Sequence, residues 1–407
     1  MVKNIIIIND FSYVNGGASR VALESAKGLS MRGFNIIFFS SVGLQDESYH
    51  EDYFKNINLV CLNQYEIIND PYRIRAAIQG LWNFKAAYSI SKILETLSPT
   101  NTVIHIHSWT KSLSSSIIRV IWKEKFPIVI TLHDYFIACP NGLFFDFSIK
   151  KNCSERPLSF GCIKRNCDVR HYNHKIWRCI RQLVQNKIGK IPSAINCFIF
   201  VSEFSRMILE KYLPEQKKIY LIRNPINIQF DKPTPVHNNN FYIYTGRLSK
   251  EKGVIELAKA FKDKGSNLIF VGDGECKNEI LHIIPNAKIT GWVSPESVKQ
   301  YLKISRALIL PSLCYETQGA VVMEAAALGI PSIVPDTCAA REFVIDGQTG
   351  LWFKGGDFED MINKINLLED ENLIKKLGEG AFNYFWGNPP TLQKHINELI
   401  ELYEGLL

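Results

Sequence analysis

Several features that would place a protein in a particular class are missing from this sequence. No apolar run reaches the roughly 18 residues of a membrane span, and the apolar start of the chain turns polar too early for a secretory signal peptide. The G-x-G-x-x-G dinucleotide fingerprint, paired C-x-x-C knuckles and any nucleic-acid-binding motif are also absent. We therefore expect a protein of the cytosol that binds no nucleic acid and keeps its ten cysteines reduced.

The length and composition describe a globular protein with more than one domain. Its 407 residues exceed what one ordinary core holds, and 46% hydrophobic with 21% charged residues are typical of soluble globular proteins. A segment rich in Pro and Asn at 226–240 has the composition of an interdomain linker. We expect a first domain over 1–228, a second over 229–385 and a C-terminal amphipathic helix over 386–407.

Apolar runs alternate with helical patterns in both halves of the chain. This alternation predicts doubly wound α/β domains, because parallel strands are usually joined through helices. Ligands then bind at the loops beyond the carboxyl ends of the strands. The expected strands cover residues 3–10, 35–40, 102–109, 128–132 and 195–201 in the first half, and 241–245, 267–271 and 306–311 in the second.

Positive charge is concentrated in the first half. Residues 1–230 carry 29 Lys and Arg against 17 Asp and Glu, whereas the rest of the chain carries 18 against 23. Within the basic segment 164–190, Trp177, Ile180 and Val184 have the spacing of one helical face. This helix either packs its apolar face into the core, lies on an anionic bilayer, or is a solvated basic surface.

The stretch from 306 to 331 reads as strand, loop and helix. Glu316 lies in the loop beyond the strand, where open α/β sheets bind ligands. Glu324 lies on the second turn of an otherwise apolar helix that ends at Gly329. Both carboxylates could accept ligand hydroxyls, although Glu324 could also face water. The backbone amides placed to bind phosphate at the helix N-terminus are those of Thr317, Gln318, Gly319 and Ala320.

A second candidate phosphate site follows the strand at 241–245. Gly246 gives the backbone room, and Arg247 and Lys252 emerge from the strand-to-helix loop. Two cations in this position would neutralise a diphosphate, and arginine can bind it with two hydrogen bonds. A solvated basic turn would have the same pattern.

The first half offers two weaker candidates. Gly16 and Gly17 follow the first expected strand and would let the backbone approach a ligand closely, or they form a plain turn. His133 lies at the carboxyl end of the strand at 128–132 and could bind a sugar hydroxyl. A single histidine can equally be structural.

Four of the ten cysteines fall within 29 residues. They are Cys139, Cys153, Cys162 and Cys167, and this clustering is far above chance for ten cysteines in 407 residues. A structural zinc ion with thiolate ligands would stabilise a long segment with little regular pattern. Buried thiols without a metal are the alternative.

Taken together, the motifs resemble those of a known family. Its members share the E-x7-E spacing of Glu316 and Glu324, the "GRLSKEKGV" string at 246–254 and the "GDG" element at 272–274. The chain thus resembles the retaining glycosyltransferases of family 4, which include sucrose synthase and many bacterial polysaccharide enzymes. The "HDY…CPNG…C…C…C" pattern resembles a subgroup found in capsule and O-antigen clusters. Two departures are Thr-Gln-Gly after Glu316, where Phe-Gly is commoner, and the cysteine insert at 139–167.

The resemblance implies a fold and a role for each candidate residue. The implied fold has two Rossmann-like domains facing a cleft, the glycosyltransferase B architecture, with the C-terminal helix crossing back to the first domain. Glu324 would bind the ribose hydroxyls and Glu316 the sugar, Arg247 and Lys252 the diphosphate, and His133 the sugar from the other side. The remaining implied donor-binding residues are Gly16, Gly17, Gly246, Gly274, Trp292, Thr317, Gln318, Gly319 and Ala320.

The implied function is transfer of a sugar, with retention, from an NDP-sugar to a glycan or lipid-linked oligosaccharide acceptor in bacterial surface polysaccharide biosynthesis. No D-x-D motif is present, so catalysis is expected to need no metal or other cofactor, and zinc would be structural. The enzyme would be cytoplasmic and peripheral on the anionic membrane surface through basic residues 164–190. The alternatives are a non-catalytic scaffold of a polysaccharide assembly complex, an NDP-sugar epimerase and, with little support, a DNA glucosylating enzyme.

Overall fold

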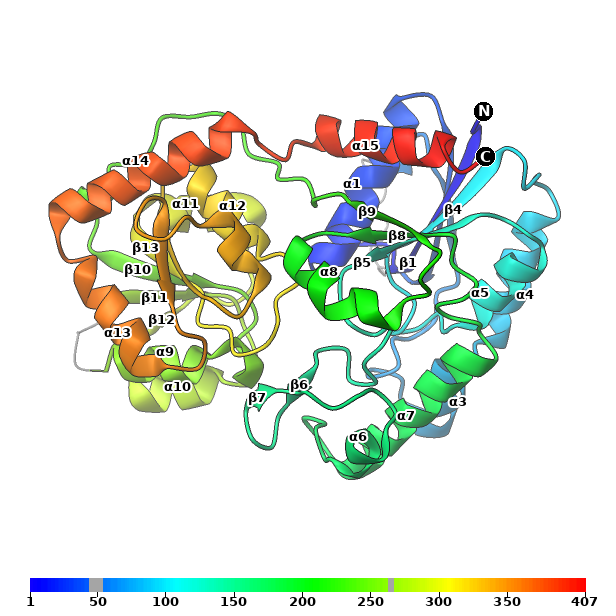
Figure 1. Ribbon diagram of the computed structural model, residues 1–407, viewed down its shortest axis with the longest axis horizontal. Helices are drawn as coiled ribbons and strands as arrows, with labels where there is room; N and C mark the ends of the chain where they lie inside the picture. Colours follow the sequence, from blue (N-terminus) through cyan, green and yellow to red (C-terminus); the bar gives the residue numbers. More distant parts are fainter. Residues whose placement is uncertain (44–53, 263–266) are drawn as a thin grey trace. The chain divides into compact units, whose positions relative to one another are not determined.

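The computed structural model describes residues 1–43, 54–262 and 267–407 and divides the chain into two compact units. Unit 1 consists of Met1–Leu143, Glu155–Pro225 and Pro390–Leu407. Unit 2 consists of Phe144–Ser154 and Ile226–Pro389. Each unit has its own parallel sheet, with helices labelled in Figure 1.

The sheet of unit 1 has seven parallel strands in the order β3-β2-β1-β4-β5-β8-β9. Central strands such as β1 are continuous apolar runs, because both faces of the sheet are covered by helices. The strand order reverses between β1 and β4, so the loops after these two strands diverge and leave a site for a ligand. The strands are β1 (Asn4–Phe11), β2 (Asn35–Val42), β3 (Asn58–Cys61), β4 (Thr102–Ile106), β5 (Ile128–Leu132), β8 (Cys197–Phe200) and β9 (Lys218–Leu221).

The helices of unit 1 include the C-terminal one. α15 packs on α1, and Ile396 of α15 fills the space left by the missing side chain of Gly28. His395 of α15 also lies 3.0 Å from the hydroxyl of Ser25. The helices are α1 (Gly17–Met31), α3 (Arg73–Leu81), α4 (Phe84–Leu94), α5 (Ser116–Lys123), α6 (Phe160–Lys164), α7 (Tyr172–Lys187), α8 (Glu203–Leu209), η2 (Glu210–Tyr212) and α15 (Leu392–Glu404).

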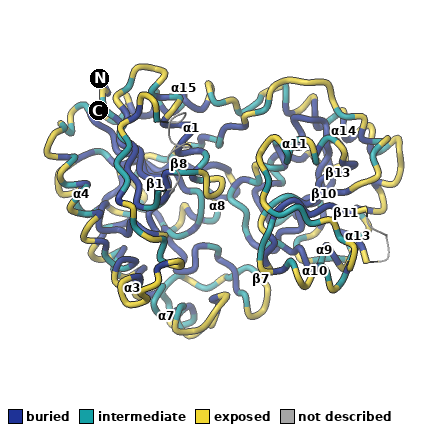
Figure 2. The backbone as a smooth tube through the Cα atoms, turned by 180° about the vertical axis from the view of Figure 1, so that it is seen from behind, coloured by how far each residue is buried: buried dark blue, intermediate teal, exposed yellow. Residues whose placement is uncertain are grey.

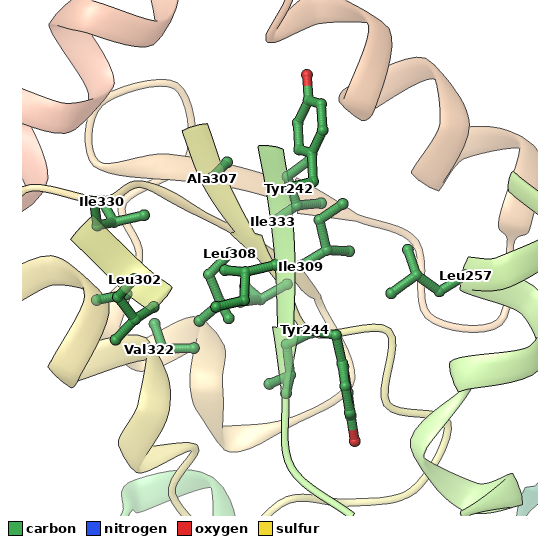
Figure 3. Packing of buried hydrophobic residues seen from close by; sticks show 14 of the residues in the cluster. Tyr242, Tyr244, Leu257, Leu302, Ala307, Leu308, Ile309, Val322, Ile330 and Ile333 are labelled. Carbon is green, nitrogen blue, oxygen red and sulfur yellow. The ribbon is translucent and has the colours of Figure 1, made fainter. Parts of the chain in front are cut away.

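The sheet of unit 2 has six parallel strands in the order β12-β11-β10-β13-β14-β15, with the reversal between β10 and β13. In its core, Leu308 of β13 lies among Leu302 and Val322 from the neighbouring helices (Figure 3). The strands are β10 (Phe241–Thr245), β11 (Leu268–Val271), β12 (Lys288–Ile289), β13 (Ser305–Ile309), β14 (Ser332–Pro335) and β15 (Gly350–Phe353).

The helices of unit 2 follow its strands in alternation, which confirms the predicted doubly wound class for both units. They are η3 (Val236–Asn238), η4 (Lys250–Lys252), α9 (Val254–Ala260), α10 (Lys277–Ile283), α11 (Pro295–Lys303), α12 (Ala320–Ala327), η5 (Ala339–Phe343), α13 (Phe358–Leu367) and α14 (Glu371–Gly387).

One segment groups differently from the expected domain limits. The short hairpin of β6 (Phe145–Asp146) and β7 (Lys151–Asn152) belongs to unit 2, although the sequence analysis placed the whole cysteine insert in the first domain. The ammonium of Lys150 in its turn lies 3.6 Å from the carboxylate of Glu256 on α9. Apart from this hairpin, the chain passes from unit 1 to unit 2 after Pro225 and returns to unit 1 after Pro389, so α15 belongs to unit 1.

α7 turns polar side chains towards the interior of unit 1 and leaves apolar side chains on its outer side, so it does not pack a continuous apolar face into the core. Arg181 and Gln182 are buried, whereas Ile180 is 45% and Leu183 44% exposed. The buried polar groups donate to backbone carbonyls of the insert loop, since Arg181 Nη2 lies 3.3 Å from the oxygen of Pro140. Similar bonds from Arg178, Gln182 and Gln185 reach the carbonyls of Asn141, Ile137 and Phe136. Carbonyl groups buried in an irregular loop need donors, and α7 supplies them.

Candidate functional site

The candidate site of unit 2 lies at the reversal point of its sheet. β10 and β13 are neighbours, and the loops after them carry Arg247 and Lys252 on one side and Ser312 and Glu316 on the other. Loops at such a point diverge and leave room for a ligand. The structure therefore brings together residues that are 64 positions apart in the sequence.

Lys252 and Glu316 form an ion pair at this edge. The Nζ of Lys252 lies 2.6 Å from Oε1 of Glu316, and the hydroxyl of Ser312 donates to the same oxygen at 2.5 Å. The two charged side chains are only 22% and 16% exposed. Burial alone would raise the pKa of Glu316, but the charge and hydrogen bond of Lys252 and the bond from Ser312 lower it. Burial likewise disfavours the charged lysine, but Glu316 raises the pKa of Lys252. Both groups are thus held charged.

Close backbone packing fixes the loop that carries Lys252. Gly253 has φ 69°, and a Cβ at this position would collide with the carbonyl oxygen of Pro311 at the end of β13. The carbonyl of Glu251 accepts from the amides of Leu313 and Cys314 at 2.9 and 3.2 Å. The two loops therefore behave as one backbone assembly, and a side chain at 253 would separate them.

The loops after β10 and β11 are also in close contact. A Cβ at Gly274 would collide with the carbonyl oxygen of Leu248, which explains a glycine there in structural terms. The carbonyl of Arg247 accepts from the hydroxyl of Tyr244 at 2.8 Å. The side chain of Arg247 is exposed, and its charge contributes to lowering the pKa of Glu316. Gly246 has φ 144°, which favours glycine.

The loop that carries Glu316 leads directly into the N-terminus of α12. Gly319 has φ 77° and caps the helix without a side-chain bond, and the amide of Val322 already donates to the carbonyl of Gly319 at 3.0 Å. Ala320 begins the helix, Thr317 and Gln318 precede it, and Glu324 is half-buried on its second turn. Backbone amides at this position form an anion site.

Trp292 lies apart from these loops along the sheet. It follows β12, the edge strand beyond β11, and is 72% exposed. This exposure excludes packing of the indole into the core. The indole is accessible for stacking on a flat ligand.

In unit 1, His133 belongs to a row of histidines that the sequence analysis did not assign. His107 follows β4 and His133 follows β5, and the Nδ1 of His107 lies 3.0 Å from the Nε2 of His133. His105 lies behind them, 4.3 Å from the ring centre of His107 and hydrogen bonded to Tyr403 and Thr131. The alternation of histidines in β4 was the signal that could have identified the row.

Burial keeps these histidines neutral. It lowers the pKa of His133 to about 3, with a further contribution from His395, and lowers the pKa values of His105 and His107 well below 6.5. The neighbouring Asp134 has the opposite shift, because burial raises its pKa to about 6. His133 can therefore offer or accept a hydrogen bond as a neutral ring, but it does not act as a cation at neutral pH.

Asp10 organises the reversal point of unit 1. It is the buried penultimate residue of β1, and its carboxylate accepts from the amides of Lys111, Ser112 and Leu113 at 2.9 to 3.1 Å. It thereby fixes the loop after β4. The sequence analysis missed this residue because a buried aspartate at a strand end has no motif of its own. Gly16 and Gly17, at the start of α1, have open space where a Cβ would lie.

The four cysteines of the expected zinc site are divided between the units. Cys139, Cys162 and Cys167 belong to unit 1 and Cys153 to unit 2. Among the residues that the structure describes, no group of three or more His, Cys, Asp or Glu is arranged to hold a metal ion. All ten cysteines carry thiols rather than disulfides. The zinc site remains a prediction that metal analysis of the purified protein tests.

A buried lysine lies among the thiols instead. Lys175 of α7 is fully buried, and its ammonium lies 3.4 Å from the Sγ of Cys162 and is hydrogen bonded to Cys167. A hydrogen bond from Cys179 and the charge of Lys175 lower the pKa of Cys162 to about 5. A buried ammonium needs a polar partner, and the sulfur of Cys162 lies within hydrogen-bonding distance of it.

None of the helices in the described ranges is long and apolar enough to cross a membrane.

Comparison with known proteins agrees with this arrangement. The sequence profile described as "Glycosyltransferase Family 4" matches residues 15–230, and that described as "Glycosyl transferases group 1" matches residues 226–384. The N-acetyl-alpha-D-glucosaminyl L-malate synthase of Bacillus anthracis is 27% identical over 379 residues, which are 90% of this chain and 88% of that protein. The capsular polysaccharide biosynthesis glycosyltransferase CapM of Staphylococcus aureus is 32% identical over 179 residues, 40% of this chain and 46% of CapM.

Solved structures share the fold over nearly the whole chain. The sucrose-phosphate synthase of Thermosynechococcus elongatus superimposes with a TM-score of 0.69 at 16% identity and 99% coverage of both chains. HepE of Anabaena in complex with UDP-glucose superimposes with a TM-score of 0.68 at 16% identity, covering 99% of this chain and 100% of HepE. These matches confirm the expected fold class, the two Rossmann-like domains of the glycosyltransferase B architecture.

Proposed function

Because the chain belongs to glycosyltransferase family 4, we propose that it transfers a sugar with retention from an NDP-sugar to a lipid-linked glycan acceptor in bacterial surface polysaccharide biosynthesis. The observation that carries this proposal is the ion pair of Lys252 and Glu316 at the reversal point of unit 2, beside the N-terminus of α12. A cation, a hydroxyl acceptor and a helix N-terminus in one place suit a sugar attached to a diphosphate.

Each of the four charged residues at the candidate site of unit 2 has a role in this proposal. Lys252 and the exposed Arg247 neutralise the diphosphate, and the amides at Gly319 and Ala320 bind one phosphate. Glu316 accepts hydroxyls of the sugar, and Glu324 accepts those of the ribose. Stabilising the leaving diphosphate is then the main contribution to the rate. Trp292 and the loops at Gly246 and Gly274 contact the nucleotide of the donor.

The chemistry at the acceptor side needs no charged base. His133 is neutral, so it binds a sugar hydroxyl through a hydrogen bond. The departing phosphate oxygen accepts the proton of the acceptor hydroxyl on the face where the new bond forms, which retains the configuration. The acceptor oxygen forms the glycosidic bond as the bond from carbon to phosphate oxygen breaks. Gly16 and Gly17 give the backbone open space to approach the diphosphate or the acceptor.

We propose that transfer uses no metal or other cofactor, because Arg247 and Lys252 supply the positive charge that a metal ion would otherwise bring to the diphosphate. Turnover should then be unchanged after treatment with a chelator. Any zinc would be structural, and the same treatment followed by metal analysis measures it. One equivalent of zinc lost together with the folded state would assign the cysteines to a zinc site.

The acceptor and the cellular location are part of the same proposal. CapM is named for capsular polysaccharide biosynthesis, and the basic character of residues 164–190 suits a lipid-linked acceptor at an anionic membrane surface. The enzyme would act at the cytoplasmic face of that membrane.

The test is a transfer assay with UDP-, GDP- and ADP-sugars and a lipid-linked acceptor, with the product anomer assigned by NMR. Retention of the donor's anomeric configuration is the expected result. Interconversion of the donor sugar without any acceptor would favour the epimerase. Failure of every nucleotide to bind would favour the non-catalytic scaffold, and an inverted product would refute the retaining mechanism.

A further inference from the structure

α7 carries an apolar stripe on its solvent side. From Tyr172 the stripe runs through Ile176, Ile180 and Leu183, at spacings of four, four and three residues that keep it on one helical face. Ile180 and Leu183 are nearly half exposed, and Tyr172 is 39% exposed. Helices of globular proteins normally turn such a stripe towards the core. Here the polar side faces inward, so the apolar stripe is left on the surface.

The neighbouring helix α3 exposes apolar side chains too. α3 packs against α7, and the indole Nε1 of Trp177 donates to the carbonyl of Ala77 at 3.3 Å. Ile74 and Ile78, one turn apart on α3, are 79% and 53% exposed. In Figure 2 the tube near the α3 and α7 labels includes residues coloured as exposed. We call the following exposed apolar side chains the α3–α7 face: Tyr72, which caps α3, Ile74 and Ile78 of α3, and Tyr172, Ile180 and Leu183 of α7.

The charge around the α3–α7 face is positive. Asp70, next to α3, is 3% exposed and paired with Arg75 at 2.8 Å, and Asp168 is buried beside Arg178 at 2.8 Å. These carboxylates are thus neutralised by their partners. The exposed cations of the two helices and their adjoining loops are Arg73, Lys164, Arg170 and Lys187.

We propose that the α3–α7 face docks on an anionic lipid bilayer, with its apolar side chains entering the interface and the surrounding cations contacting the headgroups. Large exposed apolar side chains rimmed by cations are the pattern of interfacial helices. Of the predicted basic segment, Lys175, Arg178 and Arg181 contribute little, because they are turned inward. The apolar side chains therefore contribute more to membrane binding than the cations of this segment do. The link to a lipid-linked acceptor rests on the proposed function, whereas the docking face stands on its exposed residues.

The experiment measures co-sedimentation of the full chain with vesicles of phosphatidylglycerol and phosphatidylcholine, and with vesicles of phosphatidylcholine alone. We expect binding to the anionic vesicles that weakens as salt is raised. The double variant Ile180→Asp/Leu183→Asp should bind about tenfold more weakly or worse, because it places charge where the apolar stripe enters the interface. The substitution Lys187→Gln should weaken binding to the anionic vesicles about fivefold.

A matched control makes the same two kinds of substitution at exposed positions outside the α3–α7 face. The variant Ile304→Asp/Leu367→Asp changes two side chains of unit 2 that are 45% and 49% exposed, and it should bind vesicles like the unchanged protein. If the α7 variant fails to fold, as judged by its thermal midpoint, Ile74→Asp/Ile78→Asp on α3 decides instead.

Three results would overturn the proposal. These are no binding to anionic vesicles, equal binding by the α7 and control variants, and concentration-dependent self-association that the α7 variant abolishes without any vesicle binding. Nucleotide binding is measured in the same preparations, and it should be equal in all variants. Loss of vesicle binding with normal nucleotide binding separates this inference from the proposed transfer reaction.

Discussion

The ammonium of Lys252 lies 2.6 Å from a carboxylate oxygen of Glu316, and the two residues come from loops that follow neighbouring parallel strands. Neither partner is fully buried, since 22% and 16% of their side chains remain exposed. The pair is therefore accessible to a ligand that can compete for both charges. A diphosphate can take the cation while a sugar hydroxyl takes the carboxylate, so the pair is suited to exchange its internal contact for contacts with a donor.

Replacing Lys252 tests the cation. We expect Lys252→Ala to lower kcat by about 10² to 10³-fold, because it removes a charge that stabilises the leaving group. The thermal midpoint should change little, since Ser312 still donates to Glu316 and the charge of Arg247 remains near it. Lys250→Ala is the control, because Lys250 is exposed two residues earlier in the same 3-10 helix. Near-normal turnover of Lys252→Ala would remove this role.

Replacing Glu324 tests the ribose contact. Glu324→Gln keeps the shape of the side chain but weakens two hydrogen bonds from ribose hydroxyls, so the nucleoside diphosphate should bind about tenfold to 100-fold more weakly. Calorimetric titration measures the Kd. The matched control is Glu296→Gln, on the exposed first turn of α11. Equal affinity in both variants would exclude a ribose contact at Glu324.

Two glycines with nearly the same φ allow the cost of backbone strain to be measured separately from the cost of a steric collision. Gly253 and Gly347 have φ 69° and 70°, but only at Gly253 would a Cβ meet the carbonyl oxygen of Pro311. Gly347→Ala should cost about 1 kcal/mol of the free energy of unfolding, the ordinary cost of this conformation. Gly253→Ala should cost clearly more and should also lower turnover, because it moves the loop of Lys252. Urea denaturation gives the comparison, and equal costs would contradict the close approach of the two loops.

The buried histidines predict how stability depends on pH. The pKa values of His133 and His395 are about 3 and about 4, and those of His105 and His107 are also lowered by burial. The unfolded chain therefore binds more protons below about pH 6.5, and each histidine lowers the free energy of unfolding by up to about 1.4 kcal/mol per pH unit. Asp134 has its pKa raised to about 6, so between about pH 6 and 4 the folded protein binds a proton there that the unfolded chain does not. This offsets the loss of stability caused by one of the histidines.

Urea denaturation at pH 7.5, 6 and 5 measures this loss. The free energy of unfolding should fall on acidification, and His395→Gln should make the fall shallower. His282→Gln, on the exposed side of α10, serves as the control and should leave the slope unchanged. A free energy of unfolding that does not fall between pH 7.5 and 5 would show that the histidines are protonated in the folded protein.

Much of the fold could be predicted because its signals are local. The apolar run that forms β1 can be recognised as a buried strand without knowing its neighbours in the sheet. Gly246, in the loop after β10, likewise indicates a turn from the sequence alone. The positions of Lys252 and Glu316 followed from the rule that ligands bind at the carboxyl ends of strands. Their direct contact did not follow, because it depends on which strands are neighbours in the sheet.

The orientation of α7 could not be predicted from its own sequence. Hydrophobic periodicity left open whether the apolar face with Ile180 packs into the core or lies on a surface, and the structure leaves Ile180 exposed and Arg181 buried. The decisive factor is the insert loop, whose buried carbonyls at Ile137 and Pro140 require donors from the helix. That requirement arises only when the loop and the helix are packed together. The contact of His133 with His107 was missed for the same reason, since it depends on β4 and β5 being neighbours in the sheet.

The most direct test of the account is a calorimetric titration of the protein with UDP, GDP and ADP, repeated with Lys252→Ala. We expect one of the three nucleotides to bind the unchanged protein at one site per chain and to bind Lys252→Ala about tenfold more weakly or worse. The same nucleotide should raise the thermal midpoint by mass action. Absence of binding by all three, or equal affinity in the two proteins, would contradict a donor site at the ends of β10 and β13.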